Sequence, residues 1–85
     1  EDNIIQAEAG KYRIRGLTEL EQVNQALGTS FADEDNDTIA GFVLKHFGRV
    51  PHKGESIDIE NIHFEVQRAD ASQIHILLAS HLRID

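Results

Sequence analysis

The segment Asp37–Gly48, DTIAGFVLKHFG, decides the fold of this chain. It places five large apolar residues between an aspartate suited to start a helix and a glycine suited to end one: Ile39, Phe42, Val43, Leu44 and Phe47. The pattern predicts a helix from about Thr38 to Phe47 with Asp37 as its N-cap. Because the apolar residues occupy most of its circumference, this helix needs cover on more than one side. Gly41 costs a helix about 1 kcal/mol relative to alanine, so it predicts a close backbone contact with a sheet or another helix.

Another helix is predicted upstream, over residues 18–27. Thr18 and Glu21 have the spacing of a capping box, in which two residues satisfy free backbone N–H groups at a helix start. Three apolar residues follow at helical spacing on one face, before a glycine that suits the helix end: Leu20, Val23 and Leu27. In the polar connection that follows, we expect Phe31 to fill the gap between the two helices.

The remaining segments show the alternation of half-buried strands. Lys11–Arg15, KYRIR, predicts a short strand with its basic residues on the polar face. Three further strands are predicted after residue 55, and their core-facing residues are Ile57 and Ile59, then Ile62, Phe64 and Val66, then Ile74, Ile76 and Leu78. The first two pair as a hairpin, with Ile59 opposite Ile62, and Asn61 tolerates the positive φ that a turn at Glu60 and Asn61 requires.

This order predicts an α+β domain: a strand, two helices and a three-strand meander, with both helices packed on one face of a small, mostly antiparallel sheet. We assign residues 1–10 to a linker or tail, 11–82 to the domain and 83–85 to a C-terminal tail. The chain begins without methionine, which favours a fragment of a longer protein. The uncovered sheet face would suit either solvent or a partner domain, and its predicted residues are Asp58, His63, Glu65, Gln67, His75 and Leu77.

Composition narrows the possible partners. Fifteen acidic and eight basic residues give a net charge of −7, which disfavours binding to nucleic acid or to anionic lipid surfaces. The chain lacks cysteine, which excludes disulfides, thiolate metal sites and cysteine nucleophiles. No apolar run approaches the roughly 18 residues that span a bilayer, so no direct membrane insertion is expected.

Two charged clusters are candidate sites. Asp33, Asp35 and Asp37 alternate like the start of a calcium loop, but residues 38 and 44 do not fit such a loop, so we expect at most a weak cation site. A basic cluster near the end of the central helix could hold an anion or simply complement the helix dipole: Lys45, Arg49 and Lys53, with His46 and His52 nearby.

Other chemistry has weaker support in the sequence. No histidine pair has the spacing of a helical zinc motif, although His63 and His75 could approach each other on the outer face of the sheet. The serines lack a nucleophile-elbow motif. Neither a resident metal nor an enzymatic activity is therefore expected.

A family resemblance adds to this interpretation. YRIRGLTELEQVNQALG, the run DTIAGFVLKHFGRVPHKGESIDIENIHFEV and the closing QIHILLAS together resemble the CorC/HlyC transporter-associated domain over Tyr12–Ser80. The most specific piece is a set of residues at fixed spacing: Asp37, Thr38, Gly41, Val43, Gly48, Arg49, Pro51, Gly54 and Glu55. The chain departs from the family at Asn61, where glycine is usual, which affects only the turn type.

The resemblance implies a non-catalytic regulatory or interaction domain of a magnesium and cobalt efflux protein, whose chain also carries CBS domains. Some members of the family are called hemolysins. It implies contact with those CBS domains or with a second copy, and a cytoplasmic location, including the cytoplasmic face of the inner membrane. Its fold is grouped with a flavin-binding domain, so FAD is the one cofactor suggested, although no glycine-rich phosphate loop supports it. The alternative is a module that binds flavin or adenine nucleotide near residues 49–54.

Overall fold

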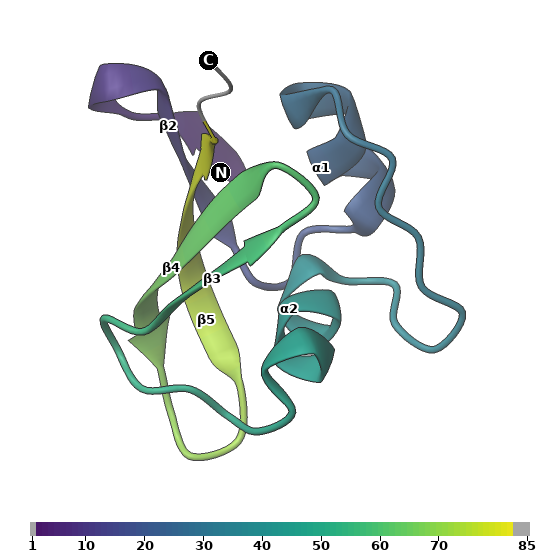
Figure 1. Ribbon diagram of the computed structural model, residues 1–85, viewed down its shortest axis with the longest axis vertical. Helices are drawn as coiled ribbons and strands as arrows, with labels where there is room; N and C mark the ends of the chain where they lie inside the picture. The colour runs from purple at the N-terminus through teal and green to yellow at the C-terminus, as the bar shows by residue number, and fades with distance from the viewer. Residues whose placement is uncertain (1, 83–85) are drawn as a thin grey trace.

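A single antiparallel sheet with two helices on one side forms the domain (Figure 1). The computed structural model describes residues 2–82. Its elements are β1 (Ile4–Gln6), the short 3-10 helix η1 (Glu8–Gly10), β2 (Lys11–Arg15), α1 (Leu20–Leu27), α2 (Ile39–Phe47), β3 (Ser56–Ile59), β4 (Ile62–Ala69) and β5 (Ile74–His81). The five strands lie in the order β1-β2-β5-β4-β3. The predicted α+β class, with two helices on one face of a small sheet, is confirmed.

The N-terminal segment differs from the prediction. Residues 1–10 are assigned to a linker or tail by the sequence, but β1 pairs with β2 and places Ile4 opposite Ile14. Ile4 packs against the core, so this part of the segment belongs to the domain. A strand of three residues with one inward side chain is too short to show a period in the sequence. The predicted C-terminal tail, 83–85, lies outside the described residues.

The hairpin of β3 and β4 has the predicted register. Ile59 pairs with Ile62 and Ile57 with Phe64, and the turn residues Glu60 and Asn61 have φ values of 46° and 73°. Two consecutive residues with positive φ are characteristic of a type I′ turn, which matches the twist of the two strands.

The predicted facing of β5 is confirmed for Ile74, which is buried in the core, but it is wrong for Ile76 and Leu78. Leu77 and Ala79 point to the core and are fully buried, whereas Ile76 and Leu78 lie on the helix-free face. Two register shifts at the end of β4 cause this difference, because they place Arg68 opposite Ile76 and break the alternation. Since residues 76–78 are all apolar, the sequence pattern fits either facing.

The core lies between the sheet and the two helices. Phe31, from the α1–α2 connection, is 3% exposed, and its ring centroid lies 4.9 Å from that of Phe42 and 5.9 Å from that of Phe64. Its ring therefore fills a gap between α2 and the sheet, whereas the expected gap lay between the two helices. The buried apolar residues are Ile14, Leu20, Val23, Leu27, Phe31, Ile39, Phe42, Val43, Ile59, Ile62, Phe64, Val66, Ile74, Leu77 and Ala79.

The two helix starts satisfy each other through backbone bonds. The Leu20 N–H donates to the carbonyl of Asp37 at 2.8 Å, and the Ile39 N–H donates to the carbonyl of Thr18 at 2.8 Å. The predicted capping box is therefore wrong: α1 begins at Leu20, and the Thr18 side chain is fully buried. The predicted N-cap of α2 is also shifted by one residue, because Thr38, not Asp37, accepts a bond from the Gly41 N–H.

Two threonines at these helix starts should respond to the same substitution with opposite sign. Within residues 2–82, the Thr18 hydroxyl is buried without a hydrogen-bond partner, so Thr18→Val removes an unsatisfied group and should raise the free energy of unfolding by about 1 kcal/mol. Thr38→Val removes a capping bond and should lower it by about 1 kcal/mol. Urea unfolding of both variants measures the difference, and shifts of equal sign would contradict it.

Gly41 has a different neighbour from the one predicted. A Cβ atom at this position would lie 2.5 Å from Oδ1 of Asn36, which belongs to the α1–α2 connection. The close contact is therefore with a loop side chain and not with the sheet or with α1. The tight backbone contact occurs at Gly16, where a Cβ would lie less than 3.0 Å from the Ile74 carbonyl oxygen and 2.9 Å from Cβ of Ala40.

Candidate functional site

The predicted anion cluster does not form a free basic surface. Arg49 makes two hydrogen bonds to the Glu55 carboxylate, at 2.9 and 2.5 Å, and Glu55 also accepts from the His52 N–H at 2.6 Å. Lys45 lies 3.3 Å from Asp33 and 3.5 Å from Asp35. Arg49 and Lys45 thus already have acidic partners, and they do not converge with Lys53 on one site.

The predicted cation cluster is likewise not assembled as three convergent carboxylates. The Asp33 side chain is only 2% exposed and accepts bonds from the Asp35 N–H, the Asn36 amide and Lys45. The first two of these bonds do most to lower its pKa to about 2. Within residues 2–82 there is no group of three or more side chains placed to hold a metal ion. Asp33 therefore acts as a structural acceptor that ties the α1–α2 connection to α2.

The Arg49–Glu55 pair should make stability depend on pH. The bonds from Arg49, followed by that from His52, lower the pKa of Glu55 from 4.5 to about 2. Because the folded-state pKa lies below the unfolded value, the pair stabilises the fold above pH 4.5 and loses this effect as the pH falls toward 2. Arg49→Gln should lower the free energy of unfolding at neutral pH, and it should make this free energy depend less on pH between 4.5 and 2. Urea unfolding across this pH range tests the expectation, with Arg68→Gln as control. If the free energy of unfolding of Arg49→Gln followed pH in parallel with that of the unsubstituted chain, the expectation would be contradicted.

The histidines have separate partners. His63 bonds to Asp58 at 2.6 Å, and His75 bonds to Asp70 at 2.6 Å. His63 lies opposite Ser80, five residues from His75 along β5, which corresponds to roughly 15 Å. The expected approach of the two rings does not occur. Asp70 also accepts bonds from the turn that follows it, and the His75 bond, with these, holds the pKa of Asp70 far below its usual range.

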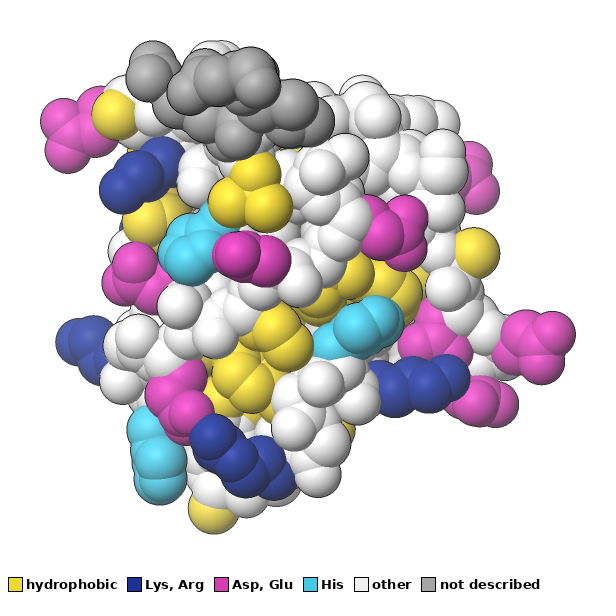
Figure 2. Space-filling model, viewed as in Figure 1, with side chains coloured by type: hydrophobic (Ala, Val, Ile, Leu, Met, Phe, Trp, Pro, Cys, Tyr) yellow, Lys and Arg dark blue, Asp and Glu magenta, His cyan; other side chains and the backbone are white. Residues whose placement is uncertain are grey.

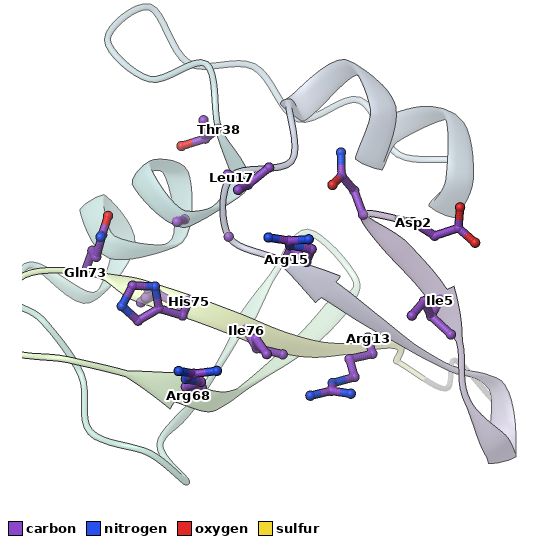
Figure 3. A pocket seen from close by; sticks show the side chains of 14 residues that line it. Asp2, Ile5, Arg13, Arg15, Leu17, Thr38, Arg68, Gln73, His75 and Ile76 are labelled. Carbon is purple, nitrogen blue, oxygen red and sulfur yellow. The ribbon is translucent and has the colours of Figure 1, made fainter.

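A concave surface that reaches from the outer side of the sheet to the start of α2 is the candidate site. It has a volume of about 620 Å³ and extends from β1 across β2 and β5 to β4, with Thr38 and Ala40 of the α2 N-terminus on its wall. Figure 3 shows Arg13 and Arg68 on either side of Ile76, with Arg15 beside them. The exposed apolar residues Ile5 and Leu17, 50% and 59% exposed, also line it.

A second concavity of about 490 Å³ adjoins the first. The two share Arg13, Arg68 and Ile76, and the second extends toward Lys53 and Glu65. We call the combined surface the basic groove; it is defined by Ile5, Arg13, Arg15, Leu17, Lys53, Glu65, Arg68 and Ile76.

The charge of the basic groove differs from that of the chain. Within residues 2–82, four of the seven basic residues line it, namely Arg13, Arg15, Lys53 and Arg68, but only two of the thirteen acidic residues do, Asp2 and Glu65. Elsewhere, acidic and basic side chains lie beside one another on the face shown in Figure 2. An acidic chain thus presents a concentrated positive surface at one place, which favours an anionic partner.

The sequence contains only part of the signal for this groove. Lys11, Arg13 and Arg15 alternate on one face of a predicted strand, which identifies a basic strand face. Arg68 and Ile76 join that face only because β5 lies between β2 and β4. The predicted facing of β5 puts Ile76 in the core and thereby hides the groove.

The family of the chain follows from comparison with known proteins. Residues 5–83 match the model of the CorC/HlyC family, described as a transporter-associated domain. The chain belongs to this family. The resemblance seen in the sequence is confirmed, and the match begins within β1, in the segment that the sequence assigns to a linker or tail.

Relatives of this transporter-associated domain include longer proteins. The magnesium and cobalt efflux protein CorC of Pasteurella multocida is 47% identical over 72 residues, which are 85% of this chain and 24% of that protein. CorC of Salmonella typhimurium is 44% identical over 73 residues, 86% of this chain and 24% of that protein. The chain thus spans about a quarter of the length of these curated relatives.

Solved structures share the fold of this transporter-associated domain. The CorC transporter-associated region of Neisseria meningitidis superposes with a TM-score of 0.91 at 37% identity, covering 95% of this chain and all of that one. A Xylella fastidiosa hemolysin domain, solved in complex with Mg²⁺ and Mn²⁺, gives a TM-score of 0.84 at 30% identity. The match covers 96% of this chain and 100% of that one. Both are domain-length chains, so domains of this kind fold alone. Within residues 2–82 of the present domain, no helix is long and apolar enough to cross a bilayer.

Proposed function

We propose that this chain is a non-catalytic regulatory or interaction domain of a CorC-type magnesium and cobalt efflux protein. It is part of a longer chain that also contains CBS domains, and it acts by contact with those domains or with a second copy. The parent protein would hold it at the cytoplasmic face of the inner membrane. Support for the efflux context comes from family membership and from relatives that are more than three times as long.

The basic groove carries this proposal. It combines exposed apolar side chains, Ile5 and Leu17, with a rim of basic residues, on a surface that runs from the sheet to the start of α2. A buried apolar centre with a polar rim is the usual composition of a protein interface. The groove therefore supports contact with another domain as the task of this one.

The hydrogen bonds of the histidines support a non-catalytic role. Within residues 2–82, His46 and His81 bond to backbone carbonyl oxygens, while His63 and His75 bond to aspartates. None of these bonds joins a histidine to a hydroxyl group that it could activate as a nucleophile. The aspartate partners of His63 and His75 are exposed surface residues and do not lie in a common cleft.

Deletion from the parent protein tests the proposal. We expect that removing the residues equivalent to 4–82 leaves the parent in the membrane at normal levels but alters cobalt resistance and magnesium efflux. Immunoblotting of membrane fractions controls for the amount of protein. Unchanged transport at an unchanged protein level would overturn the proposal.

A second candidate is a module that binds flavin or adenine nucleotide. The observation that favours it is the size of the first concavity, about 620 Å³, which lies within the range of small-molecule sites and has three arginines on its wall. The loop 49–54 is less suited than expected, because Arg49 is paired with Glu55.

Ligand-dependent melting separates the two candidates. A ligand that binds only the folded state raises its stability with concentration. We expect no saturable rise in melting temperature of the isolated chain with FAD or ATP, each with and without magnesium. A saturable rise of several degrees that Arg13→Gln abolishes would favour the nucleotide-binding module instead.

A further inference from the structure

The two concavities of the basic groove adjoin each other, and this arrangement indicates the shape of the occupant. They share Arg13, Arg68 and Ile76, and together they run from Leu17 at the end of β2 to Lys53 beyond β4. A small molecule would fill one concavity and leave the other empty. A segment of polypeptide can occupy both.

The arrangement of charge and apolar surface indicates the chemistry of the occupant. Ile76 lies on β5 between Arg15 of β2 and Arg68 of β4, which are its partners in the neighbouring strands. Since neighbouring strands are spaced by about 4.8 Å, the two arginines start roughly 10 Å apart with an apolar residue between them. Basic groups distributed in this way match several separate carboxylates and not one compact phosphate group.

Two of these arginines have no acidic partner within the described residues. Arg13 and Arg68 are exposed, and among residues 2–82 neither forms an ion pair. By contrast, Arg49 and Lys45 are paired with acidic groups of the chain. In a chain with fifteen acidic residues, unpaired arginines on one face leave their charge available to a partner.

We propose that the basic groove binds an acidic polypeptide segment with interspersed apolar side chains, supplied by the remainder of the parent chain. This inference rests on the proposed function and names the partner of the domain. Carboxylates would pair with Arg13 and Arg68, and apolar side chains would contact Ile5, Leu17 and Ile76.

Tethering explains why a segment of the same chain suits this domain. The net charge of −7 repels anionic polymers and membranes that approach from solution. A segment in the same polypeptide has an effective concentration in the millimolar range for short linkers, which offsets this repulsion. The remaining three quarters of the length of such relatives provides ample sequence for it.

Peptide selection on the isolated chain tests the chemistry of the occupant. A random peptide library is selected against the immobilised domain, and enriched peptides are synthesised and titrated while backbone amide signals are followed by NMR. We expect peptides with net negative charge and several large apolar residues, and shifts centred on Arg13, Leu17, Arg68 and Ile76. Neutral or basic peptides, shifts elsewhere, or no enrichment would overturn the inference.

Matched variants locate the binding surface. Arg13→Glu and Lys11→Glu make the same charge change two residues apart on the same face of β2, but only Arg13 lines the groove. We expect Arg13→Glu to weaken peptide binding by about tenfold and Lys11→Glu by less than about twofold. Leu17→Ser should weaken binding, whereas Leu82→Ser, at an exposed leucine outside the groove, should not. Equal effects within either pair would contradict a groove-bound peptide.

Tests with small anions and with lipid vesicles distinguish a bound peptide from other occupants of the groove. If ATP or inorganic phosphate displaces the selected peptides and itself shifts the groove amides, the groove is a small-anion site and the inference fails. If the domain sediments with phosphatidylserine vesicles and Arg13→Glu releases it, the occupant is a membrane. Peptide binding is measured without transport, so its failure leaves the deletion test of the proposed function intact.

Discussion

Gly16→Ala is expected to lower the free energy of unfolding by about 2 to 4 kcal/mol. The new Cβ would overlap the carbonyl oxygen of Ile74, a backbone atom of β5, and would lie 2.9 Å from Cβ of Ala40. The Gly16 N–H also donates to the carbonyl of His75 at 2.7 Å, and its carbonyl accepts from the Ala40 N–H at 2.9 Å. These bonds fix β5 and α2 close to Gly16, so neither can retreat without losing a hydrogen bond. Urea unfolding measures the loss.

Gly41→Ala is the matched control for this variant. Its Cβ would meet Oδ1 of Asn36 at 2.5 Å, and this amide group can turn away at the cost of its bond to Asp33. Alanine also improves helix propensity by about 1 kcal/mol, which offsets part of the cost. We expect a change within about 1 kcal/mol of zero. A loss at Gly41 as large as that at Gly16 would show that the backbone contact is not what makes Gly16 necessary.

Phe64→Ala is expected to cost about 3 to 5 kcal/mol. Phe64 is fully buried on β4, pairs across to Ala79 of β5, and packs against the ring of Phe31. The small residue opposite it cannot fill the space that the ring leaves. A domain of this length has a total stability of roughly 4 to 13 kcal/mol, so this loss is a large fraction of the total.

Phe47→Ala provides the comparison for Phe64. Phe47 lies at the end of α2 and is only partly buried against the core, so its loss leaves a smaller cavity or none. We expect less than half the effect of Phe64→Ala. Far-UV circular dichroism during urea unfolding measures both variants. Similar losses would mean that the packing between the sheet and the α1–α2 connection contributes little.

The parts of the fold predicted correctly are those in which the local pattern is unambiguous. The β3–β4 hairpin follows from alternation and from one residue, Asn61, that tolerates positive φ. The two helices follow from apolar spacing and from terminal glycines. The facing of β5 could not be derived, because three apolar residues in succession fit both faces and the shift that decides between them arises in β4.

Helix capping shows a second limit of local patterns. Thr18 and Glu21 have the capping-box spacing, yet the free N–H of Leu20 is satisfied by the carbonyl of Asp37, seventeen residues further along the chain. A backbone bond from a distant segment replaced the local side-chain bond, and Thr18 became a core residue. Sequence spacing shows which capping hydrogen bonds are possible at a helix start. Which of them form depends on the backbone groups that the rest of the fold brings close.

The candidate site was harder to predict than the fold. The two charged clusters that stand out in the sequence consist of residues close together in the chain. Some of these residues are neutralised by partners elsewhere in the chain, as Arg49 is by Glu55. The basic groove combines β1, β2, β4 and β5, so no single stretch contains it. Only the alternation of Arg13 and Arg15 gave a partial signal.

The central position of β5 has a consequence for how the domain folds. Its last strand lies between β2 and β4, so β2 can be paired on that side only after almost the whole chain is available. Residues 11–15 meet residues 76–80, and closing a loop of about 65 residues carries an entropic cost that is repaid only when this strand docks. During synthesis, the helices and the β1–β2 pair would therefore remain incompletely packed until β5 has left the ribosome. The domain should form late and in one cooperative step, and a chain that ends before Ile74 should not fold.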